Sequence, residues 1–161
     1  MKSIPSLVYL GVALIVADVG GGNVWANALS DSLLSQGRAA LESKNFDTAN
    51  FLMEQAIVAD PSNASAYLWL GRLSQEQEDI PRARKYYDTS LGIDPISQDA
   101  LLWGGEMDLA DDASEEAEEK LKRLQVLCGE CSAYQALNDM IVAYSIEEAA
   151  KAGEDISPDK E

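Results

Sequence analysis

The chain repeats itself at a constant interval. Pro61 and Pro95 lie 34 positions apart, and each follows an aspartate. A shift by the same interval places Gly37 on Gly71 and then on Gly105. Further matches at this spacing are Ala49, Ala83 and Ala117. A period of this size indicates copies of one supersecondary unit, which bury their apolar faces only by stacking on one another.

Each copy is predicted to form two antiparallel helices. Small residues such as Gly37 and Ala49 allow two helices to approach closely. In the first copy Leu52, Ala56 and Ala59 recur at helical spacing. The chain has no strand pattern, so we expect an all-α fold.

Polar residues predict where several helices begin. Asp47 is the expected N-cap of a helix in the first copy. Asp112 and Glu115, three residues apart, are typical of a capping box in the third copy. Ser132 and Gln135 have the same spacing and predict a final helix after the repeats.

The unit has glycine early, alanine in the middle and proline at the end, and it resembles the tetratricopeptide repeat (TPR) family over about residues 30–131. The resemblance is carried by Gly37, Ala49, Ala56, Pro61, Tyr67, Leu70, Gly71, Ala83, Tyr87, Pro95, Gly105, Ala117, Leu121 and Leu124. It implies a right-handed solenoid of helical hairpins with units at 30–63, 64–97 and 98–131, the last of them degenerate. The helix at 132–152 would cap the stack, and the polar segment 153–161 is predicted to be disordered.

The first residues are typical of a secretory signal peptide. Lys2 precedes an apolar run over residues 7–17, which is shorter than the roughly 20 residues that span a bilayer. Small residues predict cleavage after Ala26 or Ala28, so we assign residues 1–26 to the signal peptide. An uncleaved anchor and a buried N-terminal helix are the alternatives. Because no cysteine lies near the cleavage site, we expect no lipid anchor.

The composition excludes several classes of function. The chain has 28 acidic and 12 basic residues and a net charge of −16, which argues against nucleic acid and anionic membranes as partners. It has no histidine, so it lacks Ser-His-Asp and Cys-His catalytic pairs and histidine metal ligands. We therefore expect no metal, no cofactor and no enzymatic activity.

Cys128 and Cys131 are the only cysteines of the chain, and they fall in the turn where the earlier copies have an aspartate-proline pair. Two neighbouring cysteines in an oxidising compartment tend to pair, which predicts a structural disulfide. The alternative is a thiol-disulfide oxidoreductase, because Cys131 lies near a helix N-terminus, a position that activates thiols. Haem attachment would need a histidine where Ser132 stands.

In the TPR family the first helix of each unit lines a concave groove that takes peptides or partner helices. The resemblance implies that the groove is lined by Leu34, Arg38, Leu41, Leu68, Arg72, Gln75, Leu102, Glu106 and Leu109. Three of the leucines share one register and would form an apolar ladder: Leu34, Leu68 and Leu102. Arg38 and Arg72 share another register and suit a carboxylate. Two other interpretations stay open: the arginines pair with Glu42 and Glu76 of their own helices, and the leucines pack between repeats.

These features predict a non-enzymatic adaptor or scaffold of the cell envelope that binds a protein or peptide. The resemblance is to small exported bacterial members of the family, so we expect a periplasmic protein, with secretion as the alternative. The alternative functions are a periplasmic thiol-disulfide oxidoreductase that uses Cys128 and Cys131, and a structural subunit that stacks on itself. The sequence leaves the oligomeric state open.

Overall fold

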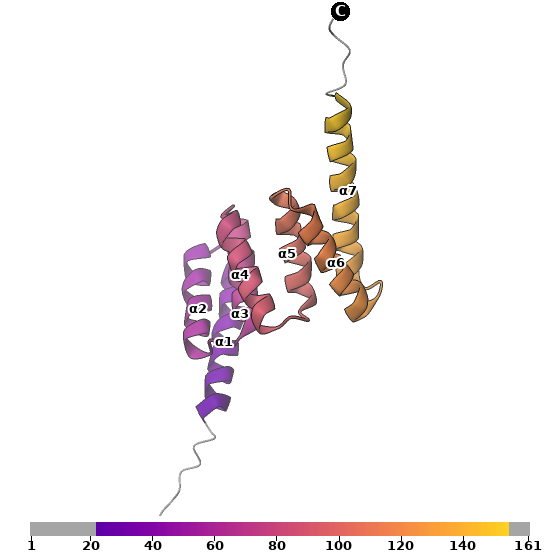
Figure 1. Cartoon of the computed structure of the whole chain (residues 1–161). Coiled ribbons are helices and arrows are strands. Elements are labelled where there is room, and N and C mark those ends of the chain that lie inside the picture. Colours follow the sequence, from indigo (N-terminus) through magenta and orange to yellow (C-terminus); the bar gives the residue numbers. More distant parts are fainter. Residues whose placement is uncertain (1–21, 155–161) are drawn as a thin grey trace, which may run out of the picture.

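The computed structural model describes residues 22–154 of the chain (Figure 1). This part folds into seven helices and contains no strand. The helices are α1 (Gly22–Glu42), α2 (Phe46–Ala59), α3 (Ala64–Glu76), α4 (Ile80–Ile93), α5 (Gln98–Ala110), α6 (Ser114–Cys128) and α7 (Ser132–Glu154). The predicted all-α class is confirmed.

Helices α1 to α6 form three hairpins that stack in chain order, α1 with α2, α3 with α4 and α5 with α6. The first helices contact one another, α1 with α3 and α3 with α5, whereas α2, α4 and α6 make no such contacts across residues 22–154. The stack therefore curves, with the first helices on its inner side. Helix α7 packs on α5 and α6 at the end of the stack and projects beyond the other helices in Figure 1. A solenoid of three hairpins with a C-terminal capping helix is confirmed.

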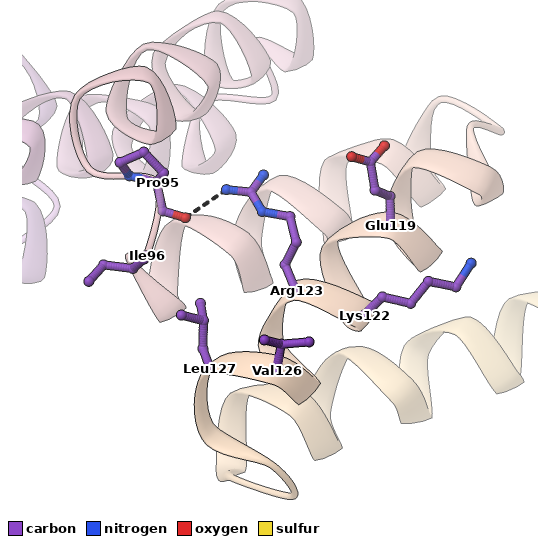
Figure 2. Close-up of a pocket in the computed structure, with 7 residues that line it drawn as sticks. All are labelled: Pro95, Ile96, Glu119, Lys122, Arg123, Val126 and Leu127. Atoms are coloured by element: carbon purple, nitrogen blue, oxygen red, sulfur yellow. Dashed lines mark hydrogen bonds between the residues drawn. The ribbon is translucent and has the colours of Figure 1, made fainter.

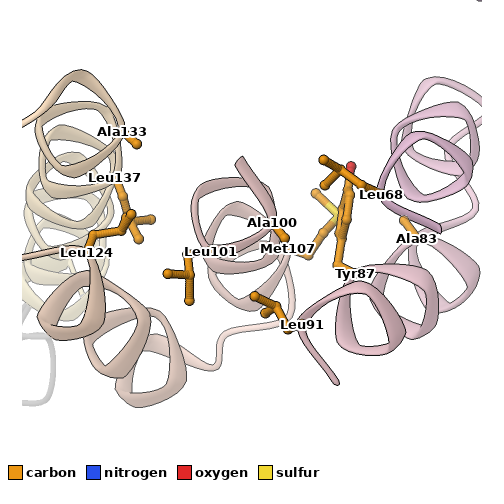
Figure 3. Packing of buried hydrophobic residues seen from close by; sticks show 10 residues of the cluster. All are labelled: Leu68, Ala83, Tyr87, Leu91, Ala100, Leu101, Met107, Leu124, Ala133 and Leu137. Atoms are coloured by element: carbon orange, nitrogen blue, oxygen red, sulfur yellow. The ribbon is translucent and has the colours of Figure 1, made fainter. Parts of the chain in front are cut away.

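Two apolar clusters hold the hairpins together. One lies between the first two hairpins and includes Met53 and Leu70. The other joins the second hairpin to α5, α6 and α7. Figure 3 shows Leu124 and Leu137 on one side of α5 and Tyr87 on the other. Full burial of one such side chain is worth about 1.5–3 kcal/mol, so these interfaces supply most of the stability of the stack.

Glycine in the first helix of each unit permits close packing. A Cβ atom on Gly71 would lie 2.5 Å from the ring of Tyr87 in α4. A Cβ atom on Gly105 would lie 2.7 Å from Leu137 in α7. In the third unit this glycine therefore packs against the capping helix, whereas in the second unit it packs against the second helix of its own hairpin.

The turn inside each hairpin has the same geometry in all three units. Lys44, Glu78 and Asp112 occupy equivalent positions of the three units and have positive φ angles of 57°, 60° and 57°. The next residue is the N-cap in each case, and the side chains of Asn45 and Asp79 accept a backbone N–H bond there. The repeat is thus visible in backbone conformation as well as in sequence.

The predicted caps of α2 and α6 are wrong. Asp47 lies inside the first turn of α2, because Asn45 is the cap. Asp112 adopts the positive-φ conformation of the turn, so it cannot cap α6. Ala113 takes the cap position and offers no side-chain acceptor.

The last helix also begins differently from the prediction. Ser132 is the first helical residue of α7 and not its cap. The side chain of Gln135 donates to the carbonyl of Glu130 and completes no capping box. Helix α7 runs to Glu154, slightly beyond the predicted end at residue 152. Residues 155–161 of the predicted tail lie outside the described residues.

The predicted signal peptide lies largely outside the described residues, which exclude 1–21. Helix α1 begins at Gly22 and runs through both predicted cleavage sites, at Ala26 and Ala28. From Trp25 onward the first buried residue of α1 is Ser30, whose Oγ donates to the carbonyl of Ala56 at 2.8 Å. Between residues 22 and 154, no helix is both long and apolar enough to span a bilayer.

Candidate protein-binding groove

The first helices of the three hairpins, α1, α3 and α5, form the inner surface of the curved stack. The predicted leucines divide into two groups there. Leu34, Leu41 and Leu68 are buried, with exposed fractions of 6%, 8% and 6%, and they belong to the apolar clusters. Leu102 and Leu109 are half-buried. Leu34 and Leu68, two of the three leucines of the apolar ladder, are therefore packed in the core. This agrees with the alternative interpretation, in which the leucines pack between repeats.

Two arginines of the groove lie over tryptophan rings of the next unit. The guanidinium carbon of Arg38 is 4.2 Å from the ring centre of Trp69, and that of Arg72 is 5.5 Å from the ring centre of Trp103. The two tryptophan rings meet edge to face at 5.6 Å. Cations placed over aromatic faces are stabilised by the ring quadrupole. The inner surface therefore carries an arginine-tryptophan ladder, formed by Arg38, Trp69, Arg72 and Trp103.

The sequence interpretation missed Trp69 and Trp103. A signal for them existed, because the two tryptophans are one repeat period apart and lie close to the register of the arginines on the same helices. In both pairs the tryptophan belongs to the unit that follows the unit of the arginine, so each contact joins neighbouring units. The contact itself follows from how the hairpins stack, which spacing alone does not give.

The two arginines differ in their polar partners. Arg72 pairs with Glu76 of its own helix at 3.4 Å and with Glu106 of α5 at 3.9 Å, and it donates to Gln75 at 3.2 Å. Arg38 is exposed and forms no ion pair with any residue between 22 and 154, so the alternative interpretation in which it pairs with Glu42 does not hold. Arg38 is thus a stacked cation whose charge no carboxylate of the described chain neutralises.

Tyr87 lies buried beneath the middle of the groove and holds a polar side chain of the groove in place. Its hydroxyl donates to Oε1 of Gln75 at 2.8 Å, and the same oxygen accepts from Arg72. Burial raises the pKa of Tyr87 well above its ordinary value, so the hydroxyl stays protonated and remains a donor. Gln75 and Arg72 are therefore held in place before any ligand arrives.

Two hollows open along this surface. The first has a volume of about 300 Å³ and is lined by Leu41, Glu42, Lys44, Trp69, Arg72 and Glu76. The second has a volume of about 380 Å³ and is lined by Glu106, Leu109, Ala110, Met140, Ala143, Tyr144 and Glu147. The groove thus extends from the α1–α2 turn to the capping helix α7, and predicted residues contribute to both ends.

A buried charge cluster lies between the second and third hairpins. Asp108 is 3% exposed, contacts Lys120 of α6 in a short ion pair and lies 3.6 Å from Arg84 of α4. Arg84 also pairs with Asp111 at 2.8 Å. Burial raises the pKa of Asp108, and the two cations counteract that effect. Because the cluster ties α4, α5 and α6 together, we assign it a structural role.

Cys128 is the last residue of α6 and Cys131 directly precedes α7, and their Cα atoms are 5.6 Å apart. Both pack against the apolar cluster that contains Leu124 and Leu137. Gly129 lies between them and has a φ of 65°, a backbone conformation that residues with a Cβ atom rarely adopt. The pair therefore brackets a tight turn against the core.

A family model described as tetratricopeptide repeat matches residues 34–97. The Arabidopsis OM64 TPR domain has a TM-score of 0.66 and 18% identity, and the match covers 74% of this chain and 98% of that one. The first TPR of Spaghetti (RPAP3), bound to HSP90 peptide SRMEEVD, has a TM-score of 0.68 and 15% identity over 76% and 95% of the two chains. The Yersinia enterocolitica type III secretion translocator chaperone SycD has a TM-score of 0.63 and 19% identity over 71% and 88%. No curated protein matches the chain. At these identities the likeness is one of fold.

Proposed function

We propose that the chain, whose residues 34–97 match the tetratricopeptide repeat family model, is a non-enzymatic adaptor that binds an acidic segment of a partner protein in the groove. The observation that carries the proposal is Arg38, a cation stacked on Trp69 without a carboxylate partner in the described chain. A guanidinium group held flat on an aromatic ring keeps its N–H donors at its edge, where a carboxylate can accept two of them.

The electrostatics of the chain support an acidic ligand at this position. The chain carries a net charge of −16, yet Arg38 is exposed and has no ion pair within residues 22–154, so its charge is available to a carboxylate of a partner. Lys44 lines the adjoining hollow and adds a second cation at the same end of the groove. The TPR of Spaghetti is bound to a peptide, SRMEEVD, that ends in a largely acidic stretch. That likeness is one of fold, so the ligand class for this chain rests on Arg38 and Lys44.

We further propose that the adaptor works in the cell envelope, in the periplasm of a bacterium. The support is the signal-like sequence of residues 1–26 and the position of Ser30, the first buried residue after the exposed start of α1. Cleavage after Ala26 or Ala28 removes no buried contact that Ser30 makes. In that compartment Cys128 and Cys131 form a structural disulfide that holds the α6–α7 turn.

The test is to capture partners from an envelope extract with the mature protein and to repeat the capture with charge-reversed variants. We predict that Arg38→Glu abolishes capture of the partner. Arg72→Glu weakens it less, because part of the Arg72 charge is already neutralised by Glu76 and Glu106. Arg38→Glu removes only an exposed interaction, so its melting temperature should stay nearly unchanged. Arg72→Glu also places a carboxylate beside Glu76 and Glu106, so it should melt at a somewhat lower temperature.

Arg82→Glu is the matched control, because Arg82 is exposed on α4, outside the inner surface. This variant has the same change of charge and should capture the partner normally. Equal loss with Arg82→Glu and Arg38→Glu would show that only overall charge matters. Unaltered capture by the double variant of Arg38 and Arg72 would exclude the groove as the binding site.

A further inference from the structure

A hollow of about 450 Å³ lies outside the groove, where the turn between α4 and α5 meets α6. Figure 2 shows Pro95 and Ile96 of the turn on one side and Val126 and Leu127 of α6 on the other. Ile96 and Val126 are 65% and 87% exposed. The guanidinium of Arg123 reaches across from α6 and donates to the carbonyl of Pro95 at 2.6 Å.

The repeat supplies an internal comparison for this hollow. At the equivalent positions of the preceding unit, Ser62 stands in place of Ile96 and Gly92 in place of Val126. The second hairpin therefore folds without apolar side chains at these two positions. Single exposed apolar side chains are common on protein surfaces, but a contiguous group of them that the fold does not need, such as Ile96, Val126 and Leu127 around one hollow, indicates a surface that contacts another molecule.

The charges beside the hollow are also particular to this unit. Lys122 and Arg123 stand where the preceding unit has Asp88 and Thr89. The only ion pair of Lys122 across residues 22–154 is with Glu118 at 3.7 Å, with both side chains more than half exposed, so a ligand can replace it at little cost. Arg123 has no carboxylate partner in the same range. Two cations thus adjoin an apolar wall in a chain of net charge −16, although Glu119 also lines the hollow.

We propose that this hollow is a second docking site, which binds a short segment of a partner protein that combines a large apolar side chain with a neighbouring carboxylate. The apolar side chain packs on Ile96, Val126 and Leu127. The carboxylate pairs with Lys122 and with the donors of Arg123 that Pro95 does not use.

A second copy of the chain fits this site less well than an acidic peptide of another protein. Two chains of charge −16 repel each other. The wall of the hollow is formed by a few side chains, whereas a stable dimer buries roughly 800 Å² per partner. The site is separate from the groove, so an adaptor with both surfaces holds two partners at once.

The experiment selects peptides from a random phage-display library on the immobilised full chain and then measures each peptide by fluorescence anisotropy. We expect one class of selected peptides to combine Asp or Glu with a large apolar residue. Their affinity should fall by about tenfold or more with Ile96→Ser and Val126→Gln together, since the loss of two central apolar contacts is worth about 1.4 kcal/mol or more, which is tenfold in affinity. It should fall similarly with Lys122→Asp and Arg123→Thr together, which introduce the residues of the preceding unit.

Two controls separate this site from the groove and from general effects. Val58→Gln changes an exposed valine of the same register outside the hollow, and it should leave the affinity unchanged. Arg38→Glu should also leave it unchanged, whereas it abolishes binding of groove ligands. Failure of the groove proposal therefore does not affect this one.

Three results would overturn the second site. The first is that no selected peptide depends on both double variants. The second is that dependent peptides lack acidic residues. The third is concentration-dependent self-association of the chain that Ile96→Ser and Val126→Gln abolish, because the occupant would then be a second copy.

Discussion

At the scale of single residues, the repeat is held in place by side chains that fit against glycine. Gly71 and Tyr87 show this most clearly, because the tyrosine ring occupies the space of a missing Cβ atom. The same ring position lets the Tyr87 hydroxyl reach Gln75 in the groove. Packing of the core and geometry of the binding surface therefore depend on the same residue.

We predict that Gly71→Ala lowers the free energy of unfolding by about 1–3 kcal/mol, because the new Cβ atom would lie 2.5 Å from the Tyr87 ring. Gly92→Ala in α4 is the control. A Cβ atom there meets nothing within 4 Å, so this change should stabilise the helix by about 0.5–1 kcal/mol. Urea unfolding followed by circular dichroism measures both. Equal effects of the two substitutions would contradict the packing argument.

At the scale of helices, the α6–α7 junction differs from the other junctions between units. The first two units end in an aspartate-proline turn, and the third ends in Cys128 and Cys131. The junction is also held by Leu124 and Leu137, which are fully buried between α5, α6 and α7. Apolar packing therefore holds the capping helix in place in addition to the two cysteines.

We predict that the protein with Cys128→Ser and Cys131→Ser folds, captures its partner and melts at a somewhat lower temperature. The short loop limits the loss to about 2 kcal/mol in the chain-entropy model. Thiol titration of the exported protein should find no free thiol, and the protein should not catalyse insulin reduction by dithiothreitol. Catalysed reduction that the serine variant lacks would instead favour an oxidoreductase.

At the scale of the whole molecule, the two ends of the stack differ in whether a further helix covers them. Helix α7 covers the C-terminal end by packing on α5 and α6. At the other end α1 starts with residues that are exposed or half-buried from Trp25 to Leu29, and burial begins at Ser30. A boundary of the folded array therefore coincides with the predicted cleavage sites.

We predict that protein from the native host begins at Asn27 or Leu29, as N-terminal sequencing would show. A chain that starts at Asn27 should melt as the longer chain does. Ser30→Ala is the control and should lower the free energy of unfolding by about 1 kcal/mol, because it removes the bond to the Ala56 carbonyl. Isolation of a product that starts at Met1 would contradict export.

The sequence by itself determined the period, the number of hairpins and the helix that follows them. These features depend on local spacing, since glycine and alanine recur once in each unit and proline ends the first two, always at the same place in the unit. Which helices line the inner surface was predicted from the resemblance to the tetratricopeptide repeat family. It did not locate the caps of α2 and α6, because polar residues at adjacent positions compete for the cap and the backbone of the turn selects one.

The tertiary structure decided which of the predicted groove residues are available to a ligand. Leu34 and Leu68 share a register with Leu102, yet stacking buries the first two more completely than the third. Stacking also places Arg38 over Trp69 of the next unit and brings Ile96 beside Val126. Such contacts depend on the rotation between neighbouring hairpins, a property of the packed interfaces that no local pattern of residues encodes.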